Sequence, residues 1–167
     1  MAPSVRRFAL TAHVASSVGW LGAVVGSGAL AVAGLTSPDA QVVRSAYITL
    51  EVMGWFVLVP LGLASLVTGL VMSLGTSWGL FRHYWILAKL AINVFASLVL
   101  LMYMQTLEYL ADVAAEATLP TDDLTGLRSS SPAVHAGAAL LMLLVATSLS
   151  IYKPRGVTRY GQPKDRS

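Results

Sequence analysis

Long uncharged runs constrain this chain more than any other feature of its sequence. Residues 8–38 and 52–81 contain no Asp, Glu, Lys or Arg, and each run exceeds the ~20 residues that a helix needs to cross a bilayer core. Two further apolar runs, 90–107 and 132–152, bring the predicted spans to four. Because 56% of the residues are apolar and only 11% are charged, against about 45–50% and about 25% in soluble domains, the runs indicate lipid contact. The predicted fold class is all-α, a transmembrane four-helix bundle.

A single membrane domain is expected over residues 1–167. Its predicted spans cover residues at about 8–35, 46–74, 84–107 and 132–152. The third helix is expected to continue past the membrane to about residue 118, because Leu107, Leu110 and Ala114 form an apolar stripe beside the acidic Asp112. The basic tail, residues 153–167, contains Pro and Gly and is expected to lack regular structure.

Basic residues are divided unequally between the alternating segments that join the spans. Only Arg44 and Arg128 of the eleven Lys and Arg fall on one side of the predicted membrane. The other nine are Arg6, Arg7, Arg82, Lys89, Lys153, Arg155, Arg159, Lys164 and Arg166. By the positive-inside rule, both termini are cytoplasmic in a multi-pass protein of the bacterial cytoplasmic (inner) membrane. The net charge of +3 is explained by this orientation, so the lipid bilayer is the expected partner and nucleic acid is not.

Two features of the first two spans predict how their helices pack. Gly22 and Gly26 form a GxxxG pattern, which permits close approach of a neighbouring helix. Pro60 has no N–H to donate to the carbonyl of Phe56, so it predicts a kink near mid-membrane.

A polar layer is predicted in the inner third of the bundle. His13 and Lys89 each lie five residues inside their span, about 7–8 Å deep at 1.5 Å per residue. Asn93 follows Lys89 on the same helical face, and Trp20 follows His13 at a spacing of seven residues. These four residues are the candidate ligand-binding or cofactor-binding set.

Each of the two ionisable residues in this layer also has a structural interpretation. Lys89 has no intramembrane carboxylate on its side, so an anionic ligand could supply the counter-charge, but its long stem could also reach lipid phosphates. His13 could be a neutral imidazole that is hydrogen-bonded to a neighbouring helix.

The three histidines and the methionines offer candidate ligands for a metal ion or a haem. A five-coordinate haem on His13, with Lys89 near a propionate, is chemically allowed. On the outer half, His135 and Met53 offer the imidazole and thioether ligands that suit copper. His13 and His135 fall in opposite halves of the membrane, so they cannot bind one ion together. The sequence leaves both cofactors open, and favours haem over copper.

No pattern of a common membrane enzyme occurs in the sequence. The chain has no nucleophile–base pair, phosphate-binding loop or paired intramembrane carboxylates, and it contains no cysteine for thiolate chemistry. No catalytic residue is therefore predicted, and a non-enzymatic role is favoured.

Three short motifs carry a family resemblance over all four spans. They are the segment from His13 to Trp20 and Gly22, the pair Thr68 and Gly69, and the segment from Trp85 to Lys89 and Leu90. With them the chain resembles an uncharacterised family of small four-span bacterial integral membrane proteins. It is also distantly similar to the copper-resistance D-type membrane domain and to HemJ-type protoporphyrinogen oxidases. The HemJ-type resemblance implies that His13 is a haem-site or porphyrin-site residue and that Lys89 is its charged partner.

The leading hypothesis is an integral membrane binding or accessory protein. Its inner polar site around His13 and Lys89 would hold an anionic or haem-like ligand. The alternatives are a haem-linked membrane oxidoreductase, a copper-handling permease component and a structural subunit of a membrane complex. A membrane protein partner or a homo-oligomer is compatible with each of them.

Overall fold

The computed structural model describes residues 1–75, 79–116, 127–154, 156–158 and 160. Its elements are α1 (Pro3–Thr36), α2 (Ala40–Met53), the π-helical turn η1 (Gly54–Leu58), α3 (Val59–Gly75), α4 (Tyr84–Ala115) and α5 (Ser131–Tyr152). Four helices in this part of the chain are long and apolar enough to cross a membrane, since α2, η1 and α3 form one continuous helix over Ala40–Gly75. The predicted all-helical architecture with four long apolar helices is confirmed.

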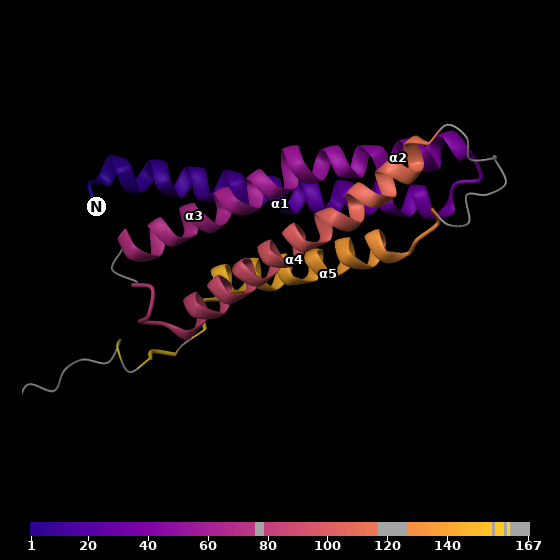
Figure 1. The fold of residues 1–167 in the computed structure, drawn as a ribbon. Coiled ribbons are helices and arrows are strands. Elements are labelled where there is room, and N and C mark those ends of the chain that lie inside the picture. Colours follow the sequence, from indigo (N-terminus) through magenta and orange to yellow (C-terminus); the bar gives the residue numbers. More distant parts are fainter. Residues whose placement is uncertain (76–78, 117–126, 155, 159, 161–167) are drawn as a thin grey trace, which may run out of the picture.

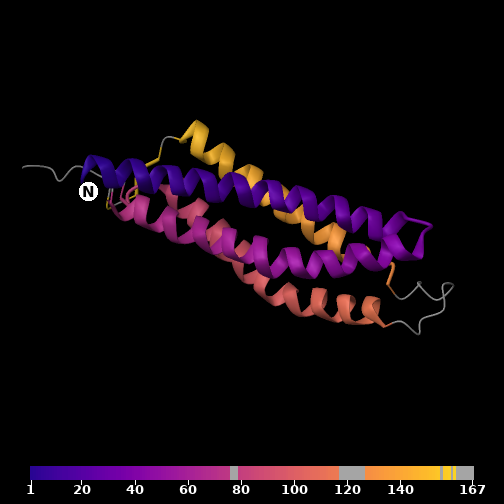
Figure 2. The ribbon, with the colours of Figure 1, turned by 90° about the horizontal axis from the view of Figure 1, so that it is seen from above.

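Each of the four long helices runs antiparallel to the next one along the chain, and together they form one elongated bundle (Figure 1). α1 contacts α2, α3 and α5, and α4 contacts the same three helices. Figure 2 shows α5 inclined to α1. The N-terminus, the end of α3, the start of α4 and the end of α5 share one end of the bundle, which we term the basic end. The opposite end, where α1 meets α2 and where α5 begins, is termed the acidic end.

Helix starts follow from local sequence. Pro3 and Pro132 stand in the first turns of α1 and α5, where a missing N–H costs no hydrogen bond. Asp39 caps α2 by accepting a hydrogen bond from the backbone N–H of Gln41 at 2.8 Å.

The turn before Pro60 is π-helical. The N–H of Val59 donates to the carbonyl of Gly54, five residues earlier, and the helix then continues as α3. A wider turn is a physical response to Pro60, whose ring would otherwise press on the carbonyl of Phe56. Pro60 predicted an irregularity of the helix at this point, and in the structure that irregularity is a π-helical turn.

The glycine pattern of α1 serves packing at one of its two positions. A Cβ on Gly26 would lie 3.2 Å from the Met53 side chain, so this glycine admits a neighbouring helix. A Cβ on Gly22 would meet nothing within 4 Å. The GxxxG pattern predicted that another helix approaches α1 at both glycines. For the helices of this chain that prediction is wrong at Gly22, because Gly22 lies on the exposed face of α1.

Packing is densest at the acidic end. Val43, Tyr47 and Met104 are fully buried there, together with Leu107 and Leu110 of α4. Asp112 is exposed on the opposite face of α4, as the predicted stripe requires. The described helix ends at Ala115, and the predicted extension to residue 118 reaches outside the described residues.

Part of the C-terminal tail is folded back onto the loop before α4. Val157 forms an antiparallel bridge with His83, and the N–H of Thr158 donates to the carbonyl of Arg82 at 3.0 Å. The Thr158 hydroxyl also donates to the carbonyl of Phe81, and this residue is buried. The tail was expected to lack regular structure, and this is wrong for Val157 and Thr158. The reason is that the hydroxyl and N–H of Thr158 donate hydrogen bonds to carbonyls of the loop before α4.

Candidate functional site

His13 joins α1 to α3 near the basic end. Its Nδ1 lies 3.1 Å from the hydroxyl of Thr68, and that hydroxyl donates to the carbonyl of Ala64 at 2.6 Å. Since a hydroxyl has one hydrogen, the bond to Ala64 leaves the Thr68 oxygen to accept a hydrogen bond from Nδ1 of His13. The imidazole of His13 is thus hydrogen-bonded to a neighbouring helix, which is the alternative to ligand binding that the sequence left open.

Ser65 connects three helices one turn deeper in the bundle. Its hydroxyl lies 2.8 Å from that of Ser17 on α1 and accepts a hydrogen bond of 3.3 Å from the side-chain amide of Asn93 on α4. The His13–Thr68 pair and this Ser17–Ser65–Asn93 bridge together form what we term the polar layer. Interhelical hydrogen bonds of this kind stabilise membrane bundles, where no water competes for the groups.

Two glycines of α3 make room for the ring side chains of α1. A Cβ on Gly69 would lie 3.0 Å from Cε1 of His13, and a Cβ on Gly62 would lie 3.1 Å from the Trp20 ring. The spacing of seven residues between Gly62 and Gly69 matches the spacing between Trp20 and His13. The two rings therefore pack against one face of α3, at levels about two helical turns apart.

Lys89 brings an uncompensated charge to the polar layer. Its Nζ lies 5.8 Å from the centroid of the Trp85 ring, within cation–π range. Its charge interacts with His13 and with Lys153. Among the described residues, no carboxylate forms an ion pair with Lys89 or lies at the basic end. Within the described ranges, the charged groups that act on it are therefore basic.

Three buried polar atoms near this layer make no hydrogen bond with the described residues. They are the indole Nε1 of Trp20, the side-chain carbonyl oxygen Oδ1 of Asn93 and the hydroxyl of Ser97. Trp20 is 2% exposed and Ser97 is 6% exposed, so water does not reach either group. An unpaired buried group costs about 1–3 kcal/mol, which makes these atoms candidate contacts for a ligand.

Ser97 lines a narrow crevice between α3 and α4. It is lined by Val59, Gly62, Leu63, Ser97, Leu100 and Leu101. Gly62 is also the residue of α3 against which Trp20 packs, but Trp20 itself is not among the lining residues. In this arrangement of the helices the crevice is too narrow for a water molecule.

The four predicted ligand-binding residues are thus partly brought together. His13 and Lys89 are close enough for their charges to interact, and Asn93 is tied into the polar layer through Ser65. Trp20 lies deeper and has no hydrogen bond to the layer. Ser65 and Thr68 of α3 complete the arrangement. Thr68 belongs to one of the three motifs in the sequence, but helical spacing alone did not predict that its hydroxyl bonds to His13.

The contacts of the His13 ring are with α3. The imidazole is closed on one side by the hydroxyl of Thr68 and on another by Gly69, with Nε2 at 3.8 Å from the position of a Gly69 Cβ. No role of His13 as a haem ligand is derived.

His135 and Met53, the predicted copper ligands, each make contacts with other side chains or backbone groups of the bundle. Nδ1 of His135 lies 2.9 Å from the carbonyl of Ser131, and its ring stacks on Tyr103 at a centroid distance of 3.8 Å. The Met53 side chain packs toward Gly26. In the described ranges, no three His, Asp or Glu side chains are grouped as a metal site. Tyr103 and Ser131, which the sequence did not single out, explain His135 as a packed and hydrogen-bonded residue.

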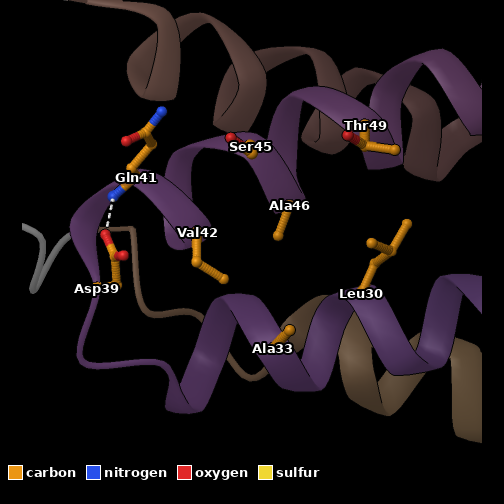
Figure 3. Close-up of a pocket in the computed structure, with 8 residues that line it drawn as sticks. All are labelled: Leu30, Ala33, Asp39, Gln41, Val42, Ser45, Ala46 and Thr49. Atoms are coloured by element: carbon orange, nitrogen blue, oxygen red, sulfur yellow. Dashed lines mark hydrogen bonds between the residues drawn. The ribbon is translucent and has the colours of Figure 1, made fainter.

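A larger groove lies at the acidic end, far from the polar layer. It has a volume of about 450 Å³ and lies between the end of α1 and the start of α2 (Figure 3). Leu30 and Ala33 of α1 face Val42 and Ala46 of α2 across it. Its lining contains neither a histidine nor a basic side chain, and nothing in the structure shows what covers it.

A comparison with family models, curated proteins and solved structures finds no match for the chain. The resemblance drawn from His13, Trp20 and Lys89 therefore stays a prediction.

Proposed function

We propose that this chain is an integral membrane binding protein that takes up an anionic group at its basic end. Lys89 would supply the counter-charge, and the polar layer around His13 would shape the site. We further propose that the basic end faces the cytoplasm of a bacterium, so that the ligand comes from the inner leaflet or from the cytoplasm.

The observation that carries this proposal is the electrostatic environment of Lys89. The charge of Lys153 repels that of Lys89, and no carboxylate of the described residues forms an ion pair with Lys89. An uncompensated ammonium inside a bilayer is costly, by about 2.5–3.5 kcal/mol at a helix centre on insertion scales and less toward the helix end. An anion bound beside it would recover part of this cost.

The test compares Lys89→Met with wild type in mild detergent. Methionine keeps the length of the side chain and removes its charge. We expect inorganic phosphate or phosphatidylglycerol to raise the unfolding temperature of wild type and to leave that of Lys89→Met unchanged, with phosphatidylcholine as the uncharged comparison. Arg6→Met is the matched control, because Arg6 is an exposed cation at the same end.

Two results would contradict the proposal. The first is a wild-type unfolding temperature that responds to neither anion. The second is a Lys89→Met variant that keeps the full response. A more stable Lys89→Met without any anion effect would mean that Lys89 only reaches toward lipid phosphates.

A further inference from the structure

Lys153 ends α5 in a backbone conformation that is uncommon for a residue with a side chain. Its backbone is left-handed, with φ 43° and ψ 65°, and among the described residues it is the one non-glycine with a positive φ. Glycine adopts this conformation at helix ends without strain, whereas a Cβ is strained there. Strain of this kind recurs at functional sites. Lys153 thus supplies an exposed charge at a position where glycine would fit the backbone better.

The chain after Lys153 is fixed against the start of α4. The N–H of Thr158 donates to the carbonyl of Arg82 at 3.0 Å, and a Cβ on Gly156 would lie 3.5 Å from Cδ2 of Tyr84. Gly156 is three residues after Lys153, and three extended residues span at most about 11 Å. The end of α5 is therefore held beside the first residues of α4.

Lys89 is the second cation in this part of the molecule. It follows Tyr84 by five residues, so it lies about 7–8 Å deeper along α4. Lys89 is half-buried, and the charge of the exposed Lys153 repels it. No carboxylate of the described residues forms an ion pair with Lys89. An anion between two such cations would turn one repulsion into two attractions.

We infer that Lys153 and Lys89 together bind a terminal phosphate group that carries two negative charges. Inorganic phosphate and the headgroup of phosphatidic acid share this chemistry, since both lose a second proton at about pH 6 to 7 in water. The phosphodiester of phosphatidylglycerol carries one negative charge and would leave one of the two lysines uncompensated. This inference rests on the proposed function and names a second residue of its site and its ligand class.

The experiment compares the affinities of phosphatidic acid and phosphatidylglycerol in mixed micelles at about pH 8, where a terminal phosphate is doubly charged. Wild type should bind phosphatidic acid about tenfold more tightly, the gain expected for one charged hydrogen bond. Lys153→Gln removes the charge and keeps a long polar side chain, so its preference should fall to about twofold or less. Lys153→Arg keeps the charge and should keep the preference.

Arg6→Gln is the matched control, because it removes an exposed cation from the same end of the bundle. It should keep the wild-type preference for phosphatidic acid. Inorganic phosphate distinguishes the two sources of the ligand. If it raises the unfolding temperature of wild type more than that of Lys153→Gln, the site accepts free phosphate. A dependence on Lys153 that is confined to phosphatidic acid identifies the lipid headgroup, and both results support the inference.

The failure of this inference differs from the failure of the proposed function. Equal affinities of wild type for the two lipids, or a full preference in Lys153→Gln, would overturn the role of Lys153 and leave anion binding at Lys89 standing. If wild type responds to neither lipid and not to inorganic phosphate, both proposals fail.

Discussion

The hydrogen bond between His13 and Thr68 gives the polar layer its fixed geometry. It links α1 to α3 at a level where no water competes, and the close approach of His13 to Gly69 keeps the ring in place. Such a bond in a membrane protein is worth about 0.6 kcal/mol on average and at most about 1.7 kcal/mol. Its contribution is therefore modest for stability and larger for positioning.

A double-mutant cycle measures this bond. Thr68→Val keeps the shape of the side chain and removes the hydroxyl, and His13→Ala removes the ring. We expect each variant to be destabilised by about 1 kcal/mol or more, and the pair to show a coupling of about 0.5–1.5 kcal/mol. Reversible unfolding in mixed micelles gives the four free energies of unfolding. Strictly additive effects would mean that the bond contributes nothing.

Gly62 is the residue at which a single added methyl group should be most informative. A Cβ there would lie 3.1 Å from the ring of Trp20, which is 2% exposed and would have to shift by a few tenths of an ångström within the core. We expect Gly62→Ala to lower the free energy of unfolding by about 1–3 kcal/mol, as overpacking does.

Gly22→Ala is the matched control for this change, because a Cβ at that position meets nothing within 4 Å. It should be neutral, or stabilising by up to about 1 kcal/mol through helix propensity. Equal effects of Gly62→Ala and Gly22→Ala would show that the Trp20 contact is loose in solution.

How far the site could be predicted from sequence depends on whether its residues share a helix. The alignment of Lys89 with Asn93 follows from a spacing of four residues, which needs only helical geometry. The pairing of His13 with Thr68 depends on the rotation of α3 about its own axis. That rotation is set by packing around Gly62 and Gly69 and by the π-turn before them, and no periodicity in one sequence records it.

At the scale of the helices, the π-turn before α3 determines which residues face the polar layer. It places one residue more in a turn than an α-helix does, so every residue after it is rotated relative to a continuous α-helix. Pro60 alone predicted only that the helix would be disturbed. The form of the disturbance could not be predicted, because a proline can be accommodated by a bend or by a wider turn.

Deletion of Phe56 tests this role of the turn. Phe56 is 77% exposed, and its removal would convert the π-turn into an ordinary helical turn without rotating α3 relative to α2. We expect the variant to be less stable than wild type, because the ring of Pro60 then presses on the carbonyl of Trp55, but to keep the anion-dependent rise in unfolding temperature proposed for wild type. The measurement is thermal unfolding with and without phosphatidylglycerol.

Deletion of Leu63 is the control for this prediction. It removes an exposed residue from the regular part of α3 and rotates Ser65 and Thr68 by about 100° away from their partners. This variant should be strongly destabilised. If both deletions were tolerated equally, the register of α3 would not determine the site.

On the scale of the whole molecule, the two ends of the bundle are built differently. The acidic end has a core of fully buried side chains such as Tyr47 and Met104, as a soluble helical domain has. The basic end has a hydrogen-bonded layer and Lys89, which no carboxylate of the described residues pairs with. Four apolar spans were predictable from hydropathy, but the dense acidic end depends on contacts between α2 and α4 that no single span reveals.

This asymmetry leads to a prediction about where the acidic end lies. α4 has 32 residues and is about 48 Å long, which exceeds the ~30 Å hydrocarbon core. Since the stripe of Leu107 and Leu110 is buried while Asp112 is exposed, we expect the surplus length of α4 to lie in water outside the cell.

The chain has no cysteine, so Asp112→Cys introduces a single thiol. In intact cells we expect an impermeant thiol reagent to label Asp112→Cys, to label Arg6→Cys only after permeabilisation, and to leave the mid-membrane Phe95→Cys unlabelled. The reverse pattern for Asp112→Cys and Arg6→Cys would invert the proposed topology, because both positions depend on the same assignment of the basic end to the cytoplasm.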